Sequence, residues 1–432
     1  MKQISNKIGL LSAISIGVGG MVGGGIFAVL GLAVSLAKGS TPISFLIAGV
    51  IAIITSYSYV KLSKSFPDRG GTVRFINQGF GKNIFSGSLN NILWISYIIM
   101  LSLYASAFGS YAPNLLKLTS NSTTDFHIYA SLIVIVSAFI NYFSIKVVSI
   151  IEAYAVYIKL IILLVFVAIG FYGLQGNSNL EQLNVEYWVH PINIVTGGMV
   201  IFVAYEGFEL IANSVPDLKN PSKNISKAYY ISVIFVVLLY LAIAIVTVGS
   251  LPFEEIAKAK DYVLAEAAEP MTGKVGFTII TIAALISTFS AINASLLGGT
   301  RVNYEIAEDD ELPHQFTHQL WGQPIGLLIT TILTLIFVNL IRLESISTAG
   351  SIGFLTIFGI VNFIGFKLSN QINGNKIVPF IGFILCLIAL SALIIQQYTD
   401  NFISILITVI IFALCFVGET IYKGKVAKKE KS

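Results

Sequence analysis

Residues 17–25 read GVGGMVGGG, a run with six glycines in the middle of an apolar segment that extends from about residue 9 to residue 36. Each glycine inside a helix costs roughly 1 kcal/mol relative to alanine. Close packing of two helices needs glycine on one face only, whereas Gly23, Gly24 and Gly25 are consecutive and face every direction. The run therefore predicts a short unwound segment within the apolar stretch, in preference to a continuous, closely packed helix.

The composition around this run is that of a membrane protein. Charged residues make up 11% of the 432 residues, and apolar residues make up 55%, whereas an average soluble protein has about 25% charged residues. Such a chain has too few charges to cover a soluble surface and too many apolar residues to be disordered. We therefore expect an all-α polytopic membrane protein. The net charge of +4 is too small and too scattered to indicate nucleic acid binding.

A helix needs about 20 mostly apolar residues to cross a bilayer, and on that basis the chain holds twelve candidate spans. Their approximate limits are 9–36, 41–62, 84–116, 127–145, 149–173, 192–213, 228–249, 274–302, 325–341, 346–366, 377–397 and 402–421. The segments between them are too short to house a catalytic domain. The first span lacks a cleavage site for signal peptidase, so we expect it to be retained.

The positive charges predict the orientation of the spans. With the N-terminus in the cytoplasm, 19 of the 26 Lys and Arg residues fall in inside segments, six fall in outside segments, and Lys159 lies within a span. This asymmetry predicts an even number of spans with both termini in the cytoplasm. The absence of a targeting segment favours the cytoplasmic membrane of a prokaryote, and the basic tail 422–432 is expected at the inner surface.

No metal site or cofactor is predicted. Cys386 and Cys415 lie in apolar runs and are expected to be small buried hydrophobic residues. His314 and His318 are four residues apart, but no apolar helix carries them, so a solvated loop is the favoured interpretation. The spans contain no HExxH sequence, no paired aspartates and no nucleophile with an obvious base, which argues against a membrane-embedded enzyme. A channel is disfavoured because no charged ring or repeated filter sequence is present.

The sixth span carries the second candidate break. It reads TGGMVIFVAYEGFELIAN over residues 196–213, and its glycine signal is weaker than that of the first span. Glu206 and Glu209 are costly in an apolar span, at about 2.5–3.5 kcal/mol each if central. They must face an interior, a partner or water, unless both lie near the end of the span.

Lys159 is the one cation predicted inside a span. It lies ten residues after the start of the fifth span at about residue 149, hence roughly 15 Å deep at 1.5 Å per residue. Snorkelling to the interface would require a longer side chain. A buried amine that can be charged or neutral could carry a proton, and a fixed structural cation is the alternative.

Unwound backbone at membrane depth is tolerated where it lines a cavity or is buried in protein. Free N–H groups at the start of a half-helix bind a carboxylate, and free carbonyl groups bind an ammonium. Two facing breaks therefore predict a site for a small zwitterion.

Three stretches resemble signatures of the amino acid–polyamine–organocation transporters. They are GVGGMVGGGIF at residues 17–27, FVAYEGFE at 202–209 followed by NPSKNISKA at 220–228, and SAINASLLGGTRVNYEIAEDDELP at 290–313. The similarity covers essentially the whole chain, and Lys159 makes the proton-coupled archaeal members of the family (ApcT type) the most similar subgroup.

The resemblance implies a LeuT-type fold in one membrane domain, 1–432, with two inverted five-span repeats. These are residues 9–173 and 192–366, with broken helices 1 and 6, followed by two extra helices at 377–421. Spans 11 and 12 are candidates for an oligomer contact or a lipid-facing brace, so a homo-oligomer is left open.

The resemblance also implies the roles of individual residues. The carbonyl groups of Val22, Val203, Ala204 and Glu206 would hold the ammonium of the substrate, and the N–H groups of Gly23, Gly24 and Gly25 would hold its carboxylate. Ile26 and Tyr104 complete the expected substrate site, and Lys159 is the expected proton-coupling group. Supporting positions are Glu209, Ser287 and Ser290. Glu206 could select cationic substrates or simply pair with another residue.

The expected function is proton-driven secondary transport of amino acids by alternating access. The rival within transport is an amino acid or polyamine exchanger in which Lys159 is structural. The preferred side chain cannot be inferred from the sequence.

Overall fold

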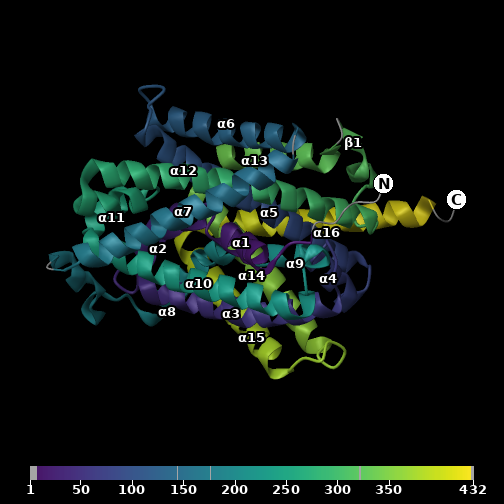
Figure 1. The fold of residues 1–432 in the computed structure, drawn as a ribbon. Coiled ribbons are helices and arrows are strands. Elements are labelled where there is room, and N and C mark those ends of the chain that lie inside the picture. The colour runs from purple at the N-terminus through teal and green to yellow at the C-terminus, as the bar shows by residue number, and fades with distance from the viewer. Residues whose placement is uncertain (1–6, 144, 176, 321–322, 430–432) are drawn as a thin grey trace.

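The computed structural model describes residues 7–143, 145–175, 177–320 and 323–429. The described chain is almost entirely helical (Figure 1). The α-helices are α1 Leu10–Met21, α2 Gly25–Ala37, α3 Thr41–Ser65, α4 Thr72–Phe80, α5 Ile84–Tyr111, α6 Ser122–Phe143, α7 Ile145–Gly173, α8 Pro191–Val200, α9 Leu210–Asn213, α10 Pro221–Ser250, α11 Phe253–Lys258, α12 Val263–Glu308, α13 Ile325–Leu340, α14 Leu343–Lys367, α15 Ile377–Asp400 and α16 Phe402–Lys429.

Short elements complete the chain. The 3-10 helices are η1 Ala112–Asn114, η2 Ser178–Leu183, η3 Val185–Tyr187, η4 Phe202–Tyr205, η5 Val215–Asp217 and η6 His314–Thr317. Two antiparallel strands, β1 Gln319–Leu320 and β2 Gln323–Pro324, form a single small ribbon in which Gln319 is opposite Pro324. Three α-helices begin with a proline at their first or second position, in α3, α8 and α10, where the missing N–H costs nothing.

The helices confirm an all-α polytopic membrane protein. Within the described residues, nine helices are long and apolar enough to cross a membrane, and two bent helix pairs bring the number to eleven. The bent pairs are α1 with α2, at 43°, and α8 with η4 and α9, at 50°. The helix that corresponds to the predicted ninth span, α13, has only 16 residues and falls short of the length that a span normally requires. The twelve-span count therefore stays a prediction.

The helices α16 and α12 extend beyond the spans predicted for them. The last helix, α16, continues to Lys429, beyond the end predicted at residue 421, because lysines near a helix C-terminus interact favourably with the helix dipole. Residues 430–432 of the predicted tail and Lys2 at the N-terminus lie outside the described residues. In α12, Gly273 has φ 64° and interrupts the helix three residues after Pro270, so the predicted start of the eighth span at residue 274 coincides with this kink.

One helix forms the centre of the bundle. In an apolar stretch of 18 residues, α5 has 89% of its residues buried, whereas α6, α7, α15 and α16 each have 33% buried. The exposed side of α7 carries large apolar side chains such as Ile158, Ile161 and Val165. The central helix therefore packs against protein on all sides, and the four peripheral helices present apolar surfaces suited to lipid.

Connecting segments predicted on the cytoplasmic side meet at one end of the bundle. These segments are 63–83, 214–227 and 303–324. Arg69 forms an ion pair with Asp217 at 3.1 Å, and Lys82 pairs with Asp309 at 2.7 Å. The described part of the chain thus brings together three segments that the charge distribution assigned to one side.

Segments predicted on the opposite side meet at the other end. A β-bridge pairs Lys38 with Trp188. The amide of Gln182 donates to the carbonyl groups of Val248 and Leu251, at 2.8 and 2.7 Å. The alternation of the chain between the two ends therefore agrees with the predicted order of the spans.

Candidate functional site

The break in the first span consists of Val22, Gly23 and Gly24. The last intrahelical bond of α1 runs from the N–H of Val22 to the carbonyl of Val18, and the first bond of α2 runs from the N–H of Ala28 to the carbonyl of Gly24. N–H groups in the first turn of a helix have no intrahelical acceptor. The N–H groups of Gly25 and Ile26 thus lie at the free N-terminal end of α2, where the helix dipole favours a negative charge.

The break in the sixth span centres on Gly207. This residue has φ +118°, a region that side chains with a Cβ rarely adopt. On its N-terminal side, residues 202–205 form the 3-10 helix η4, and Glu206 has an extended backbone with ψ 148°. The sequence predicted the weaker break here, yet the 50° bend is larger than the 43° bend of the first span. The number of glycines did not indicate this, because one glycine in an unusual conformation is sufficient to bend the span.

The two breaks are in direct backbone contact. A Cβ placed on Gly20 would lie 3.0 Å from both Cα and the carbonyl oxygen of Gly207, and a Cβ on Gly25 would lie 2.9 Å from Cα of Ala204. Glycine at positions 20 and 25 is therefore what lets the two spans approach so closely.

A tyrosine from α10 bridges the two breaks. The hydroxyl of Tyr240 lies 2.6 Å from the carbonyl of Met21 and 3.2 Å from the carbonyl of Ala204. It thereby ties the end of α1 to η4. Tyr240 was not predicted, because an isolated tyrosine in an apolar span carries no local signal.

The aromatic ring of Tyr104 covers the first break. A Cβ on Gly24 would lie 2.4 Å from its ring carbon Cδ1. Its hydroxyl donates to Oε2 of Glu206 at 3.1 Å. The helix α5 thus brings together three residues that the sequence predicted in one site: Gly24, Tyr104 and Glu206.

Glu206 and Glu209 have different surroundings, although each side chain is only 1% exposed. Glu209 accepts from the hydroxyl of Tyr97 at 3.1 Å and from the N–H of Gly207 at 2.8 Å. Oε1 of Glu206, in contrast, has no hydrogen-bonding partner among the described residues. Both carboxylates are therefore buried within the protein. Glu206 presents a free acceptor at the break, whereas Glu209 is bound into the structure.

The serines of the eighth span differ in their relation to the first break. Oγ of Ser287 lies 2.9 Å from the carbonyl of Val22 and 2.8 Å from that of Gly23. Ser290 is buried on the same helix. A carbonyl oxygen has two lone pairs, so Val22 retains acceptor capacity beside Ser287.

The carbonyl and amide groups around η4 are also in use. The N–H of Val203 donates to Oγ of Ser351, and its carbonyl accepts from the N–H of Glu206. Ser347 and Ser351 of α14 both donate to the carbonyl of Val200 at 2.9 Å. These two serines were not predicted, although their spacing of four residues on one helix face is a signal that could have identified them.

Lys159 is fully buried on α7, and its ammonium donates to the carbonyl of Gly19 at 3.0 Å. This contact connects the fifth span with the glycine run of the first. The side chain of Lys159 is 0% exposed, so its ammonium does not extend to the surface of the protein.

Among the described residues, no group of three His, Cys, Asp or Glu side chains is arranged to hold a metal ion. Both cysteines are buried and free, as the sequence predicted. The site consists of backbone groups, hydroxyl groups and one carboxylate with a free oxygen. Such groups can bind a small ligand that carries both an anionic and a cationic group.

The fold is that of a polytopic membrane protein in which two interrupted helices contact each other at their breaks. A family model described as amino acid permease matches residues 8–418. The chain is 33% identical over 435 residues to an uncharacterized protein of Methanocaldococcus jannaschii, which covers 99% of this chain and 98% of that protein. It is 30% identical over 398 residues to the inner membrane transport protein YbaT of Escherichia coli, which covers 92% of each chain.

A more distant relative is the serine/threonine exchanger SteT of Bacillus subtilis, at 24% identity over 319 residues, with 72% of this chain and 70% of that protein covered. The chain belongs to the amino acid permease family of the amino acid–polyamine–organocation superfamily. It is therefore a multi-pass membrane transporter rather than an enzyme, and its family supports amino acid transport.

Proposed function

We propose that this protein is a proton-coupled amino acid transporter that binds its substrate between the breaks of spans 1 and 6. The single observation that carries the proposal is the contact between the two breaks, where Gly20 meets Gly207 and Tyr240 bridges Met21 and Ala204. An α-amino acid matches this arrangement because it has a carboxylate for the free N–H groups of α2 and an ammonium for nearby acceptors.

The pattern of contacts supports the two repeats at residues 9–173 and 192–366. Counterpart helices contact each other across the bundle: α3 contacts α10, α5 contacts α12, and α6 contacts α13. The broken pair of the first half also meets the broken pair of the second. A two-fold relation between inverted repeats produces such a pairing, and rocking of one repeat against the other would alternate access to the site.

Glu206 is the residue that we assign to the ammonium of the substrate. Its Oε1 is buried and has no hydrogen-bonding partner among the described residues, and a buried acceptor left without a donor costs about 1–3 kcal/mol. The α-ammonium of a bound amino acid would donate to this oxygen and offset that cost. The Glu206→Gln variant lacks the carboxylate, so it should lose this interaction with the substrate ammonium.

Lys159 is the group that we assign to proton coupling. It is buried, it contacts the first span at Gly19, and movement of that span would change its surroundings. The second candidate function is exchange, for which the same hydrogen bond serves as a fixed structural tie. One relative is named an exchanger. Counterflow that is independent of a pH gradient would favour exchange.

The remaining assignments follow the charge distribution. We place the protein in the cytoplasmic membrane of a prokaryote with both termini in the cytoplasm, and we leave open a homo-oligomer through α15 and α16.

The function is tested by reconstituting the purified protein in liposomes. Uptake of one labelled amino acid, in competition with the twenty amino acids and several polyamines, is measured with and without a pH gradient. Accumulation driven by the gradient supports the proposal, and uptake of no amino acid under either condition contradicts it.

A further inference from the structure

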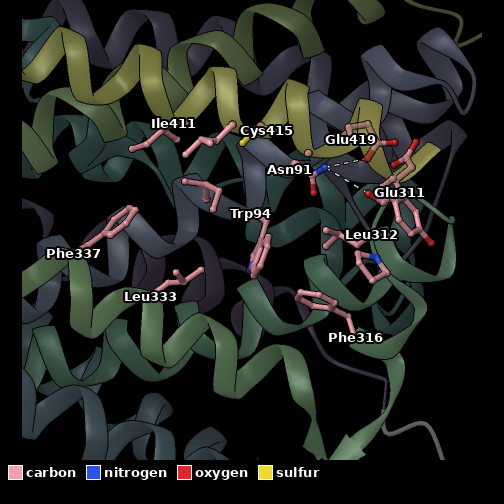
Figure 2. Close-up of a pocket in the computed structure, with 15 residues that line it drawn as sticks. Asn91, Trp94, Glu311, Leu312, Phe316, Leu333, Phe337, Ile411, Cys415 and Glu419 are labelled. Atoms are coloured by element: carbon pink, nitrogen blue, oxygen red, sulfur yellow. Dashed lines mark hydrogen bonds between the residues drawn. The ribbon is translucent and has the colours of Figure 1, made fainter. Parts of the chain in front are cut away.

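A pocket with a volume of about 480 Å³ lies between α5, α13, α16 and the segment around residue 312 (Figure 2). Its volume falls in the range of about 300–1,000 Å³ typical of sites for small ligands. None of its lining residues belongs to either helix break. One wall is α16, a peripheral helix on which Leu414 is 65% exposed, so the pocket borders the surface expected to face lipid.

Most of the pocket is apolar. Figure 2 shows Trp94, Phe337 and Leu333 around one part, and Leu312 and Phe316 around another. The indole N–H of Trp94 donates to Thr330 at 3.1 Å, and the ring of Phe316 packs edge-on against Trp94 with centroids 5.5 Å apart. The rings are thus held in place, and the space between them suits an alkyl chain.

At one end of the pocket lie two polar side chains whose free acceptor atoms are buried. Glu419, which is 1% exposed, accepts from the amide of Asn91 through Oε2 at 3.2 Å. Oε1 of Glu419 and Oδ1 of Asn91 are buried, and neither has a hydrogen-bonding partner among the described residues. Two buried acceptors without donors each cost free energy. The chemistry that would satisfy both is a ligand with several N–H donors.

A lysine lies near these acceptors. Lys423 follows Glu419 by four residues on α16, and its charge acts on both Glu311 and Glu419. Among the described residues, no ion pair joins Lys423 to either carboxylate. The end of the pocket therefore combines an anionic wall with a nearby positive charge, which complements a zwitterionic group.

We propose that this pocket binds one ethanolamine phospholipid. Its primary ammonium would donate to Oε1 of Glu419 and Oδ1 of Asn91, its phosphate would lie toward Lys423, and one acyl chain would lie along Trp94. A choline phospholipid has the same phosphate and chains, but its quaternary ammonium carries no N–H. The pocket therefore distinguishes the two headgroups by hydrogen bonding.

The test uses the fluorescence of Trp94 in nanodiscs. Trp188→Phe and Trp321→Phe leave Trp94 as the single tryptophan, since the chain has three. Phosphatidylethanolamine or phosphatidylcholine with brominated chains, which quench tryptophan on contact, is titrated into otherwise identical bilayers. We expect half-maximal quenching at about tenfold lower mole fraction for phosphatidylethanolamine, the selectivity that one charge-assisted hydrogen bond supplies.

Two variants locate the effect. Gly418 lines the pocket, and a Cβ there would meet nothing within 4 Å, so Gly418→Leu should fill the space and abolish selective quenching without disturbing the helix. Gly424→Leu is the matched control, because Gly424 lies on the same helix, is equally unobstructed and does not line the pocket. Glu419→Gln should retain quenching but lose the preference for ethanolamine.

Equal quenching by the two lipids in the otherwise unchanged single-tryptophan protein would overturn the proposal. So would selective quenching that survives Gly418→Leu. Both outcomes are independent of transport, because lipid binding is measured on the protein without substrate.

Discussion

The ammonium group of Lys159 lies 3.0 Å from the backbone carbonyl of Gly19, which joins the middle of the fifth span to the first span four residues before Gly23. A carbonyl oxygen accepts a strong hydrogen bond from a charged ammonium and a weaker one from a neutral amine. Loss of a proton from Lys159 would thus weaken the tie between the two spans, and this gives the proposed coupling a physical route to the substrate site.

Lys159→Arg separates coupling from structure. Arginine stays charged in proteins, so it can replace a structural cation but cannot release a proton. We expect Lys159→Arg and Lys159→Ala to abolish accumulation of substrate in response to a pH gradient in liposomes. Lys258→Gln, at an exposed lysine outside the spans, should behave like the unchanged protein. Gradient-driven accumulation by the arginine variant would identify Lys159 as a structural cation.

Tyr104→Phe tests the assignment of Glu206. It removes the hydroxyl that donates to Oε2, and hydrogen bonds to charged groups contribute about 1.5–3 kcal/mol. We expect the apparent KM for uptake to rise about tenfold or more. Tyr97→Phe is the matched control, since it removes a similar bond from Glu209 away from the free acceptor. Equal effects of the two variants on KM would count against a specific role for Glu206.

Gly207→Ala tests the contact between the breaks. A Cβ there would lie 2.4 Å from the carbonyl carbon of Gly20, in a backbone conformation with φ +118°. Such strain costs about 1–3 kcal/mol before the clash is added. We expect a clear fall in Tm in detergent, measured by thermal unfolding. Gly359→Ala, whose Cβ would make an ordinary contact at 3.4 Å from Cys386, should change Tm little. A Tm unchanged by Gly207→Ala would show that the two breaks are not in contact.

The network at the end of α5 predicts a pH dependence. Glu311 is buried and accepts from Ser86 at 3.0 Å and from Asn90 at 2.6 Å. Burial raises the pKa of the Glu311 carboxyl above its ordinary value of 4.5. The folded state therefore binds this proton more tightly than the unfolded state. The resulting stabilisation is complete below pH 4.5 and is lost as pH rises through the folded-state pKa.

Glu311→Gln should remove that component. We expect the Tm of the unchanged protein to fall more steeply than that of the variant as pH rises from about 4.5, with Glu181→Gln, at an exposed glutamate, as the control. Parallel Tm profiles for Glu311→Gln and the unchanged protein would mean that Glu311 does not titrate in this range.

Much of the fold could be predicted from local sequence. The length of the apolar runs predicted most helix limits to within a few residues, and the run from Gly17 to Gly25 predicted the first break. The second break was underestimated because it depends on the conformation of Gly207 alone. A glycine count carries no information on φ, whereas consecutive glycines predict a break directly.

The site was predicted in part. Tyr104 and Ser287 are beside the first break, as the family resemblance implied, but the roles of Tyr240 and Ser351 depend on contacts between residues 36 and 148 positions apart in the chain. Such contacts are set by packing in three dimensions, which no local pattern records. The lipid pocket was missed for the same reason, since its acceptors come from α5 and α16.

The most direct test of the proposed site is equilibrium binding of a transported amino acid to purified Gly24→Leu. A Cβ at Gly24 would lie 2.4 Å from Tyr104, and a leucine there would occupy the space in front of the N–H groups of α2. The control is Gly9→Leu in the same span, where a Cβ meets nothing within 4 Å, and both variants are first shown to unfold cooperatively. We predict that Gly24→Leu loses binding by at least about a hundredfold, or roughly 2.7 kcal/mol, while Gly9→Leu binds normally. Binding by Gly24→Leu with unchanged affinity would contradict a substrate site between the two breaks.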